Sequence, residues 1–138
     1  MEHLGQVSNL IVHHSASPRD TTTVEKIREW HKARGFEDVG YHWVIESNGE
    51  IRQGRLPTVK GAHCKGRNFD SWGVCVVGDN TKPLEAWNLS QEDALLSVIR
   101  AVRVMVPGIQ IFGHREVQGA STECPGLEFQ TWLKNHGG

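Results

Sequence analysis

The stretch SWGVCVVGD, residues 71–79, contains a near-continuous apolar run that ends in glycine and aspartate. Strands that are buried on both faces have this pattern, whereas half-exposed strands alternate between apolar and polar residues. We therefore expect residues 71–79 to form a central strand in a sheet that helices cover on its faces.

Three further segments can join this strand. Residues 10–14 (LIVHH) and 109–116 (IQIFGHRE) each begin with a short apolar run of the kind typical of buried strands. Residues 41–55 (YHWVIESNGEIRQGR) form two alternating segments around Asn48-Gly49, which predicts a hairpin with a two-residue turn.

Helical patterns separate these segments. Thr22 and Glu25 can form a capping box for a first helix that ends at Gly35, and the buried side would contain Val24, Ile27, Trp30 and His31. A second helix is predicted from Ser90, with Asp93 reaching back to it, to the stop at Pro107-Gly108. Residues 127–138 predict a short C-terminal helix. The fold class is α/β: a central mixed sheet flanked by helices, in one domain spanning residues 1–138.

Composition and charge narrow the range of partners that the protein could have. The net charge of −1 and the lack of a Lys/Arg-rich run disfavour a nucleic-acid partner. No apolar run approaches the roughly 20 residues that cross a bilayer, and the N-terminus lacks the pattern of a secretory signal. We expect cytoplasmic synthesis and no membrane partner. Three cysteines without a C-x-x-C pair argue against a disulfide framework and a zinc ribbon.

Two histidines follow apolar strand segments directly, His13 after LIV and His114 after IQIFG. Strand carboxyl ends are where α/β folds place their sites, and the loop GASTECPG is long enough to return Cys124 to the same edge. Three nitrogen or sulfur ligands with a fourth position open is the pattern of a catalytic zinc site, in which zinc activates a water molecule. His14 would point to the opposite face of its strand.

Tyr41 would reach the same edge if its strand ran antiparallel to the other two, and its phenol could then assist proton transfer. Taken singly, each of these residues has a plainer interpretation. A histidine at a strand end is more often only hydrogen-bonded, and a lone cysteine is more often a small buried hydrophobe. Spacing alone leaves both interpretations open.

The motifs IVHHSAS, REWHKARGFEDVGYHWVI, GAHCKGRNFDSWGVCVVGD, GHREV and TECPG occur together in this order. In order and spacing the chain resembles the phage-lysozyme-type N-acetylmuramoyl-L-alanine amidases, which share a fold with animal peptidoglycan recognition proteins. The similarity runs from about residue 9 to residue 134. It implies Zn²⁺ as cofactor, with His13, His114 and Cys124 as ligands and Tyr41 as the catalytic tyrosine.

The resemblance also assigns further residues. Thr122 stands where the phage branch usually has a lysine, and its hydroxyl implies stabilisation of the oxyanion by hydrogen bonding. The segment from His114 to Cys124 is about two residues longer than usual, which puts the geometry of Thr122 in question. His63 and Asn68 correspond to residues that line the peptidoglycan groove, and we expect both to be exposed in a Gly-rich loop.

The implied activity is hydrolysis of the amide between the muramic acid lactyl group and L-alanine in bacterial peptidoglycan, by a monomeric phage or prophage endolysin that acts on the wall after release. The alternative is a non-catalytic peptidoglycan-binding module of the same fold. Such modules typically lack the cysteine ligand, so the presence of Cys124 favours the enzyme. By family analogy alone, a phage RNA polymerase is a further partner.

Overall fold

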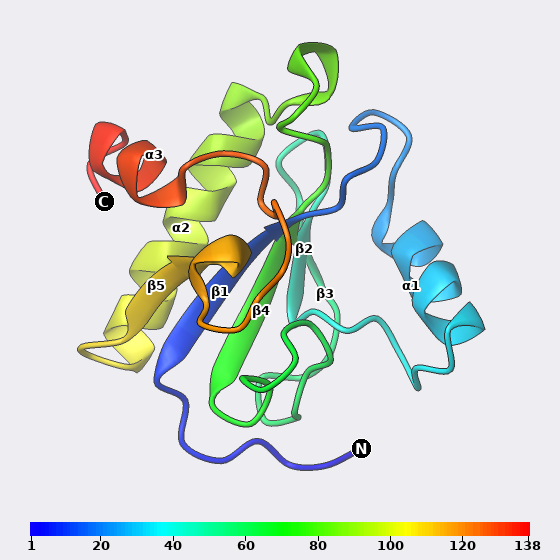
Figure 1. Ribbon diagram of the computed structural model, residues 1–138, viewed down its shortest axis with the longest axis vertical. Coiled ribbons are helices and arrows are strands. Elements are labelled where there is room, and N and C mark those ends of the chain that lie inside the picture. The colour runs from blue at the N-terminus through cyan, green and yellow to red at the C-terminus, as the bar shows by residue number, and fades with distance from the viewer.

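The computed structural model describes residues 1–138 and contains one five-stranded sheet with helices on both faces (Figure 1). The strands are β1 (Asn9–His14), β2 (Trp43–Ile45), β3 (Ile51–Gln53), β4 (Ser71–Val76) and β5 (Gln110–Gly113). Their order is β3-β2-β4-β1-β5. The predicted α/β class with a mixed sheet is confirmed, and β4 is central, as expected from its apolar run.

The strand directions correct one prediction. β1 pairs parallel with β4 and β5, and β2 also pairs parallel with β4, so only β3 is antiparallel to its neighbour. Tyr41 was expected to reach the site if its strand ran antiparallel to the other two, and that condition is not met. The reason is the helix between β1 and β2, which carries the chain back to the other end of the sheet and permits a parallel return.

The helices divide between the two faces. The structure contains α1 (Val24–Ala33), α2 (Leu89–Met105), α3 (Phe129–Asn135) and the short 3₁₀ helices η1 (Pro83–Glu85) and η2 (His114–Glu116). Helices α2 and α3 pack on one face, and α1 packs on the other (Figure 1). None of these helices has the length and apolar character needed to cross a membrane.

Helix α1 begins one residue later than predicted. Its N-cap is Thr23, whose hydroxyl accepts a hydrogen bond from the Lys26 backbone N–H at 3.2 Å. Thr22 is buried, and its hydroxyl donates to the Pro18 carbonyl at 2.6 Å. The Thr22–Glu25 capping box is therefore wrong, because the turn at Pro18 already occupies the Thr22 hydroxyl.

The buried stripe of α1 is narrower than predicted. Val24, Ile27 and His31 are buried, whereas Trp30 exposes 45% of its surface. Trp30 lies about 60° around the helix from Ile27, outside the side that contacts the sheet. The helix ends as expected, with Gly35 in the left-handed region at φ +94°.

Helix α2 also starts from a different cap than predicted. Asn88, not Ser90, is the N-cap: its Oδ1 accepts from the Gln91 N–H at 2.9 Å, and Gln91 Oε1 accepts from the Asn88 N–H at 3.0 Å. Gln91 Nε2 also donates to the Val77 carbonyl at 2.8 Å. Asp93 has no side-chain N–H and could not donate to the Val77 carbonyl. The Asn88–Gln91 capping box therefore both starts the helix and fixes its position on the sheet.

The hairpin turn differs from the two-residue prediction. The Gly49 N–H donates to the Glu46 carbonyl, and the Glu46 N–H donates to the Glu50 carbonyl, which leaves a three-residue loop. Only Gly49 has a positive φ, +84°, whereas a type I′ turn would also require one at Asn48. Gly49 thus serves as the left-handed residue that follows an ordinary turn.

Candidate metal centre

Three side chains from separate parts of the chain converge on the face of the sheet that α1 partly covers. His13 is in β1, His114 directly follows β5, and Cys124 is in the loop that leads to α3. Because β1 and β5 are adjacent and parallel, their carboxyl ends lie side by side. One potential ligand atom from each of the three residues lies within 4.8 Å of those of the others. The predicted convergence of His13, His114 and Cys124 is confirmed.

The two ring nitrogens of His13 have different neighbours. Nδ1 is 3.6 Å from Cys124 Sγ, and Nε2 is 3.0 Å from Nδ1 of His63. The His114 ring is edge-on to His13, with 4.7 Å between centroids. Since His63 engages Nε2, Nδ1 is the nitrogen of His13 that faces Cys124. A partner on the second nitrogen is what orients a metal-binding histidine.

Burial favours the neutral form of these imidazoles. It lowers the pKa of His13 well below the ordinary value, and the neighbouring His63 and His114 lower it further. Burial also lowers the pKa of His114, and it lowers that of His63 to about 3. A neutral imidazole is the form that binds a metal ion.

The Cys124 thiol fits the same interpretation. Burial raises its pKa to about 12, against the opposing effect of the His14 backbone N–H, which donates to Sγ at 3.4 Å. A thiolate at this position therefore requires a nearby cation. Two imidazole nitrogens and one sulfur are donors that suit zinc, and three protein ligands are typical of catalytic zinc sites. The donor set and its spacing fit a zinc ion.

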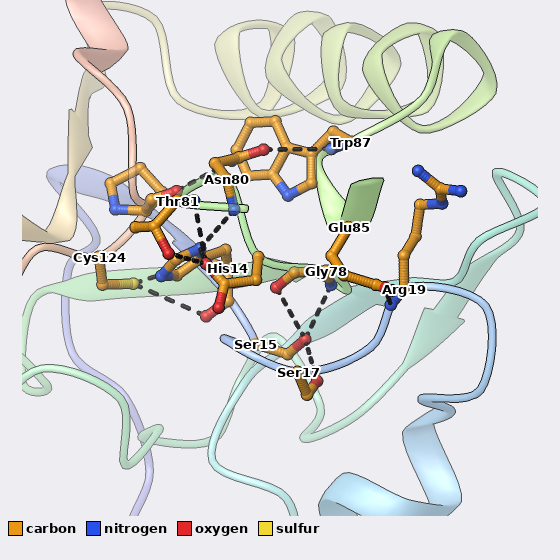
Figure 2. Close-up of polar contacts among 12 residues, drawn as sticks. His14, Ser15, Ser17, Arg19, Gly78, Asn80, Thr81, Glu85, Trp87 and Cys124 are labelled. Atoms are coloured by element: carbon orange, nitrogen blue, oxygen red, sulfur yellow. Dashed lines mark hydrogen bonds and ion pairs between the residues drawn. The ribbon is translucent and has the colours of Figure 1, made fainter. Parts of the chain in front are cut away.

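The cysteine loop is fastened to the ends of β1 and β4 (Figure 2). Asn80 Nδ2 donates to the Pro125 carbonyl at 2.9 Å, and the Asn80 backbone N–H donates to His14 Nδ1 at 3.2 Å. Asn80 Oδ1 accepts from the Trp87 N–H at 3.1 Å. The His14 ring thus contacts Asn80 on the side of the sheet opposite His13, as strand alternation predicts. Through Asn80, His14 helps to hold the loop that carries Cys124.

Tyr41 lies two residues before β2 and beside the three-residue group. Its half-buried ring is 5.0 Å from the His13 ring and 5.5 Å from the His31 ring, measured between centroids. Burial raises the pKa of the phenol well above its ordinary value, and Cys75 and Cys124 add to this. Tyr41 reaches the site although β2, the strand that follows it, is parallel to β4. This is possible because the site occupies the face of the sheet as well as its edge.

His63 and Asn68 lie in the loop before β4 and are less exposed than predicted. The His63 ring is buried behind His13, and its Nε2 has no hydrogen-bond partner in the protein. A Cβ at Gly73 would lie 2.6 Å from this ring, so only glycine leaves room for it. Asn68 is half-buried, and its Oδ1 accepts from the backbone N–H groups of His63 and Cys64, both at 2.9 Å. Asn68 therefore shapes the loop that positions His63.

Thr122 is exposed at the rim of the site. Its Oγ1 accepts a hydrogen bond from the Cys124 backbone N–H at 3.1 Å, which leaves the hydroxyl proton available for another acceptor. The Arg115 N–H donates to the Cys124 carbonyl at 2.7 Å and ties the far end of the same loop to η2. Despite the longer segment, Thr122 remains beside the cysteine.

Some contributions were not anticipated. The His13–His63 contact joins a residue of β1 to one in the loop before β4 and has no signature in spacing. His31, assigned only to a helix, accepts from the Gly40 N–H at 2.8 Å through Nδ1 and supports Tyr41. Asn80 lies four residues after the central strand β4, and its position near a strand carboxyl end was the available signal.

A mixed α/β sheet with two imidazoles and one thiol gathered at its strand ends, beside the half-buried Tyr41 phenol, offers the ligand set typical of a metal-dependent hydrolase. The comparisons with known proteins make this more specific. The family model described as N-acetylmuramoyl-L-alanine amidase matches residues 3–127. The chain belongs to this family and is a peptidoglycan amidase of the endolysin type.

Individual relatives agree. The endolysin of Enterobacteria phage K11 is 36% identical over 133 residues, which cover 94% of this chain and 87% of the phage protein. Peptidoglycan-recognition protein SC2 of Drosophila melanogaster is 32% identical over 138 aligned positions, covering 91% and 74% of the two chains. The solved N-acetylmuramoyl-L-alanine amidase LysC of Clostridium intestinale superposes with a TM-score of 0.84 at 27% identity, covering 96% and 86%. The resemblance inferred from the motifs is confirmed.

Proposed function

We propose that residues 1–138 act as one catalytic domain that hydrolyses the amide between the N-acetylmuramic acid lactyl group and L-alanine, with Zn²⁺ held by His13, His114 and Cys124. The observation that carries this proposal is the convergence of the three ligand atoms within 4.8 Å, with the Tyr41 ring beside His13. Family membership supports the reaction, and the donor set supports the metal.

When bound, zinc supplies Lewis acidity and the activation of a water molecule. The other roles belong to side chains of this chain. The raised pKa of the half-buried Tyr41 phenol means that it keeps its proton near neutral pH, so Oη can donate to the substrate carbonyl and assist proton movement toward the departing amine. Thr122 Oγ1 can donate its proton to the developing oxyanion.

His63 acts in this scheme through His13. Its Nδ1 lies 3.0 Å from His13 Nε2, so it holds the His13 ring with Nδ1 turned toward Cys124. Asn68 acts one step further out, by shaping the loop that carries His63. Direct contact of either residue with peptidoglycan is a part of the proposal that rests on the family resemblance.

The endolysin relatives support a biological setting. We infer that the protein is made in the cytoplasm of a bacterial host and acts as a monomer on the cell wall after release. Peptidoglycan is its partner. A phage RNA polymerase is a partner by family analogy only, and no feature of the metal centre bears on it.

The proposal is tested by measuring zinc content together with digestion of purified sacculi. We expect about one zinc per chain and new free L-alanine amino termini in the digest. Cys124→Ser should lose both. Cys64→Ser is the matched control, because Cys64 is buried in the neighbouring loop but outside the three-residue group.

The same experiment separates the enzyme from a non-catalytic binding module. A zinc-loaded protein that binds sacculi without releasing amino termini would identify the binding module. A protein that releases amino termini equally well after Cys124→Ser would show that the cysteine is not needed, and the proposed ligand set would have to be abandoned.

A further inference from the structure

A buried histidine in the last turn of α1 lies against the Tyr41 side chain. His31 exposes only 8% of its surface, and its ring lies 5.5 Å from the Tyr41 ring and 5.1 Å from the Phe36 ring, measured between centroids. Nδ1 of His31 also accepts a hydrogen bond from the Gly40 backbone N–H at 2.8 Å. One imidazole thus touches the backbone just before Tyr41 and packs beside the Tyr41 ring.

The backbone around Tyr41 precedes β2 and is held by contacts with other segments of the chain. The Gly40 carbonyl accepts from the Ala62 N–H at 2.9 Å, and the Tyr41 carbonyl accepts from the Arg55 N–H at 2.9 Å. A Cβ at Gly40 would collide with the Ala62 carbonyl oxygen, so only glycine fits at this position. Within residues 40–42, the bond from the Gly40 N–H to His31 is the one that ties the backbone to α1.

This bond requires a neutral imidazole with a free lone pair on Nδ1. Burial lowers the pKa of His31, and the neighbouring Arg34 and Arg55 lower it further, so the ring is neutral near pH 7. When Nδ1 accepts, the ring proton is on Nε2. Gly40 is buried, and a buried N–H that loses its acceptor is costly. Without His31, the segment would therefore have to shift until the Gly40 N–H met another acceptor.

We propose that His31 is a positioning residue for the reaction: by accepting from the Gly40 N–H, it fixes the place of the Tyr41 phenol beside the candidate metal centre. This inference rests on the proposed function, because the place of the phenol matters for turnover only if Tyr41 donates to the substrate. The Tyr41 ring lies 5.0 Å from the His13 ring, so a shift of the Gly40 backbone would move the phenol relative to the ligands. A misplacement of about 1 Å can lower a rate about 10²-fold.

Asparagine and glutamine at position 31 separate this role from simple packing. The Oδ1 atom of asparagine stands near the position of a histidine Nδ1, whereas the amide of glutamine reaches the position of Nε2. His31→Asn therefore keeps an acceptor for the Gly40 N–H, and His31→Gln fills the space without one. In His31→Gln, kcat on a defined muropeptide should fall about 10- to 100-fold with little change in KM or zinc content. His31→Asn should retain most of the turnover.

Two further variants show whether His31 acts through Tyr41. Ile27→Val is the matched control, because Ile27 is buried one turn earlier on the same side of α1 and makes no polar contact; it should keep the kcat of the unaltered protein. In the Tyr41→Phe background, His31→Gln should cost little further turnover, because the hydroxyl that His31 positions is already absent. An equal loss in both backgrounds would show that His31 acts independently of the phenol and would overturn the proposal.

NMR measurements make the outcome independent of hydrolysis. In the zinc-loaded protein, hydrogen exchange at the Gly40 amide should be slow, remain slow in His31→Asn and Ile27→Val, and become faster in His31→Gln. The ¹⁵N signals of the His31 ring need no substitution: a proton on Nε2 is expected, and a proton on Nδ1 would exclude the bond to Gly40.

The two kinds of measurement keep this proposal separate from the proposed function. Absence of hydrolysis by the unaltered protein would contradict the proposed function, and the NMR data would still decide whether His31 holds the Gly40 amide. Hydrolysis with equal kcat in His31→Gln and His31→Asn, or with unchanged exchange at Gly40 in His31→Gln, would overturn the role of His31 alone.

Discussion

The two faces of the sheet bury very different side chains. On the face covered by α2 and α3, Leu10 and Val12 of β1 join an apolar cluster of 17 buried residues. On the face covered by α1, the same strand presents Ile11 and His13, and the apolar cluster contains only six buried residues. The difference shows how one strand can serve stability and chemistry at once. Alternation sends neighbouring residues to opposite faces, so His13 takes no place in the larger apolar cluster.

Helix α1 covers only part of the second face, and the rest of that face holds the candidate metal centre. Helix α1 packs over the part of the sheet formed by β2 and β4, as its cluster with Val44, Cys75 and Val77 indicates. The part formed by β1 and β5 is bordered by loops, one of which supplies Cys124. Substitutions on the two faces should therefore affect different measurements.

Tyr41→Phe should give the largest functional effect. It removes one hydroxyl, and loss of a positioned proton donor costs roughly 10²–10⁴-fold in rate. Zinc content and the free energy of unfolding should change little, because the ring stays in place beside His13. The measurement is kcat on a defined muropeptide with zinc determination. If the metal is lost as well, Tyr41 has a structural role at the centre.

Leu95→Ala tests the opposite face. Leu95 is fully buried in α2, and truncation of such a residue lowers the free energy of unfolding by about 2–5 kcal/mol. The folded variant should keep its zinc affinity, because the large cluster does not include the ligand residues. Denaturant unfolding and chelator competition measure the two quantities. A parallel loss of zinc affinity would show that the faces are not independent.

Asn80→Ala should weaken the metal site without disrupting the core. The change removes the bonds that Asn80 makes to the Pro125 carbonyl and the Trp87 N–H. Loss of an outer partner typically costs about 10–100-fold in metal affinity. Chelator competition measures it, and the absorption of the Co²⁺-substituted protein reports the cysteine bond. Thr81→Ala in the same loop, which loses only a contact with Asp79, should leave both unchanged. Equal effects of the two variants would refute the special role of Asn80.

Thr122→Ala should give the smallest effect. Thr122 is exposed, and the variant loses one hydrogen bond to the Cys124 N–H together with one donor to the substrate. A single neutral hydrogen bond is worth about 0.5–1.5 kcal/mol, so kcat/KM should fall roughly 2- to 10-fold. Thr122→Ser, which keeps the hydroxyl, should retain most of the activity. A loss of 100-fold or more in the alanine variant would mean that Thr122 is a principal oxyanion donor.

Much of this architecture could be predicted from local patterns. The apolar run of residues 71–79 indicated the central strand, and the strand-end positions of His13 and His114 indicated where a site would form. Cys124 was placed by the length of its loop. The period of two along β1 separated His13 from His14 without further information. These features depend on local patterns of apolar residues, on loop length and on strand alternation, all of which can be read from the sequence without knowledge of tertiary contacts.

Other features depend on competition between neighbours. Thr22 and Thr23 are chemically equivalent caps, and only the contact with Pro18 decides between them. The direction of β2 depends on how the chain returns from α1. The contact between His63 and His13 joins positions 50 residues apart. Pattern reasoning cannot rank such alternatives, because each is settled by packing that forms only in the folded chain.

The most direct test of the zinc centre is X-ray absorption at the zinc edge of the loaded protein. The account predicts two nitrogen ligands at about 2.0–2.1 Å and one sulfur at about 2.3 Å, with the sulfur signal lost in Cys124→Ser and kept in Cys64→Ser. A first shell without sulfur, or a sulfur signal that survives Cys124→Ser, would contradict the assignment of His13, His114 and Cys124 as the ligands.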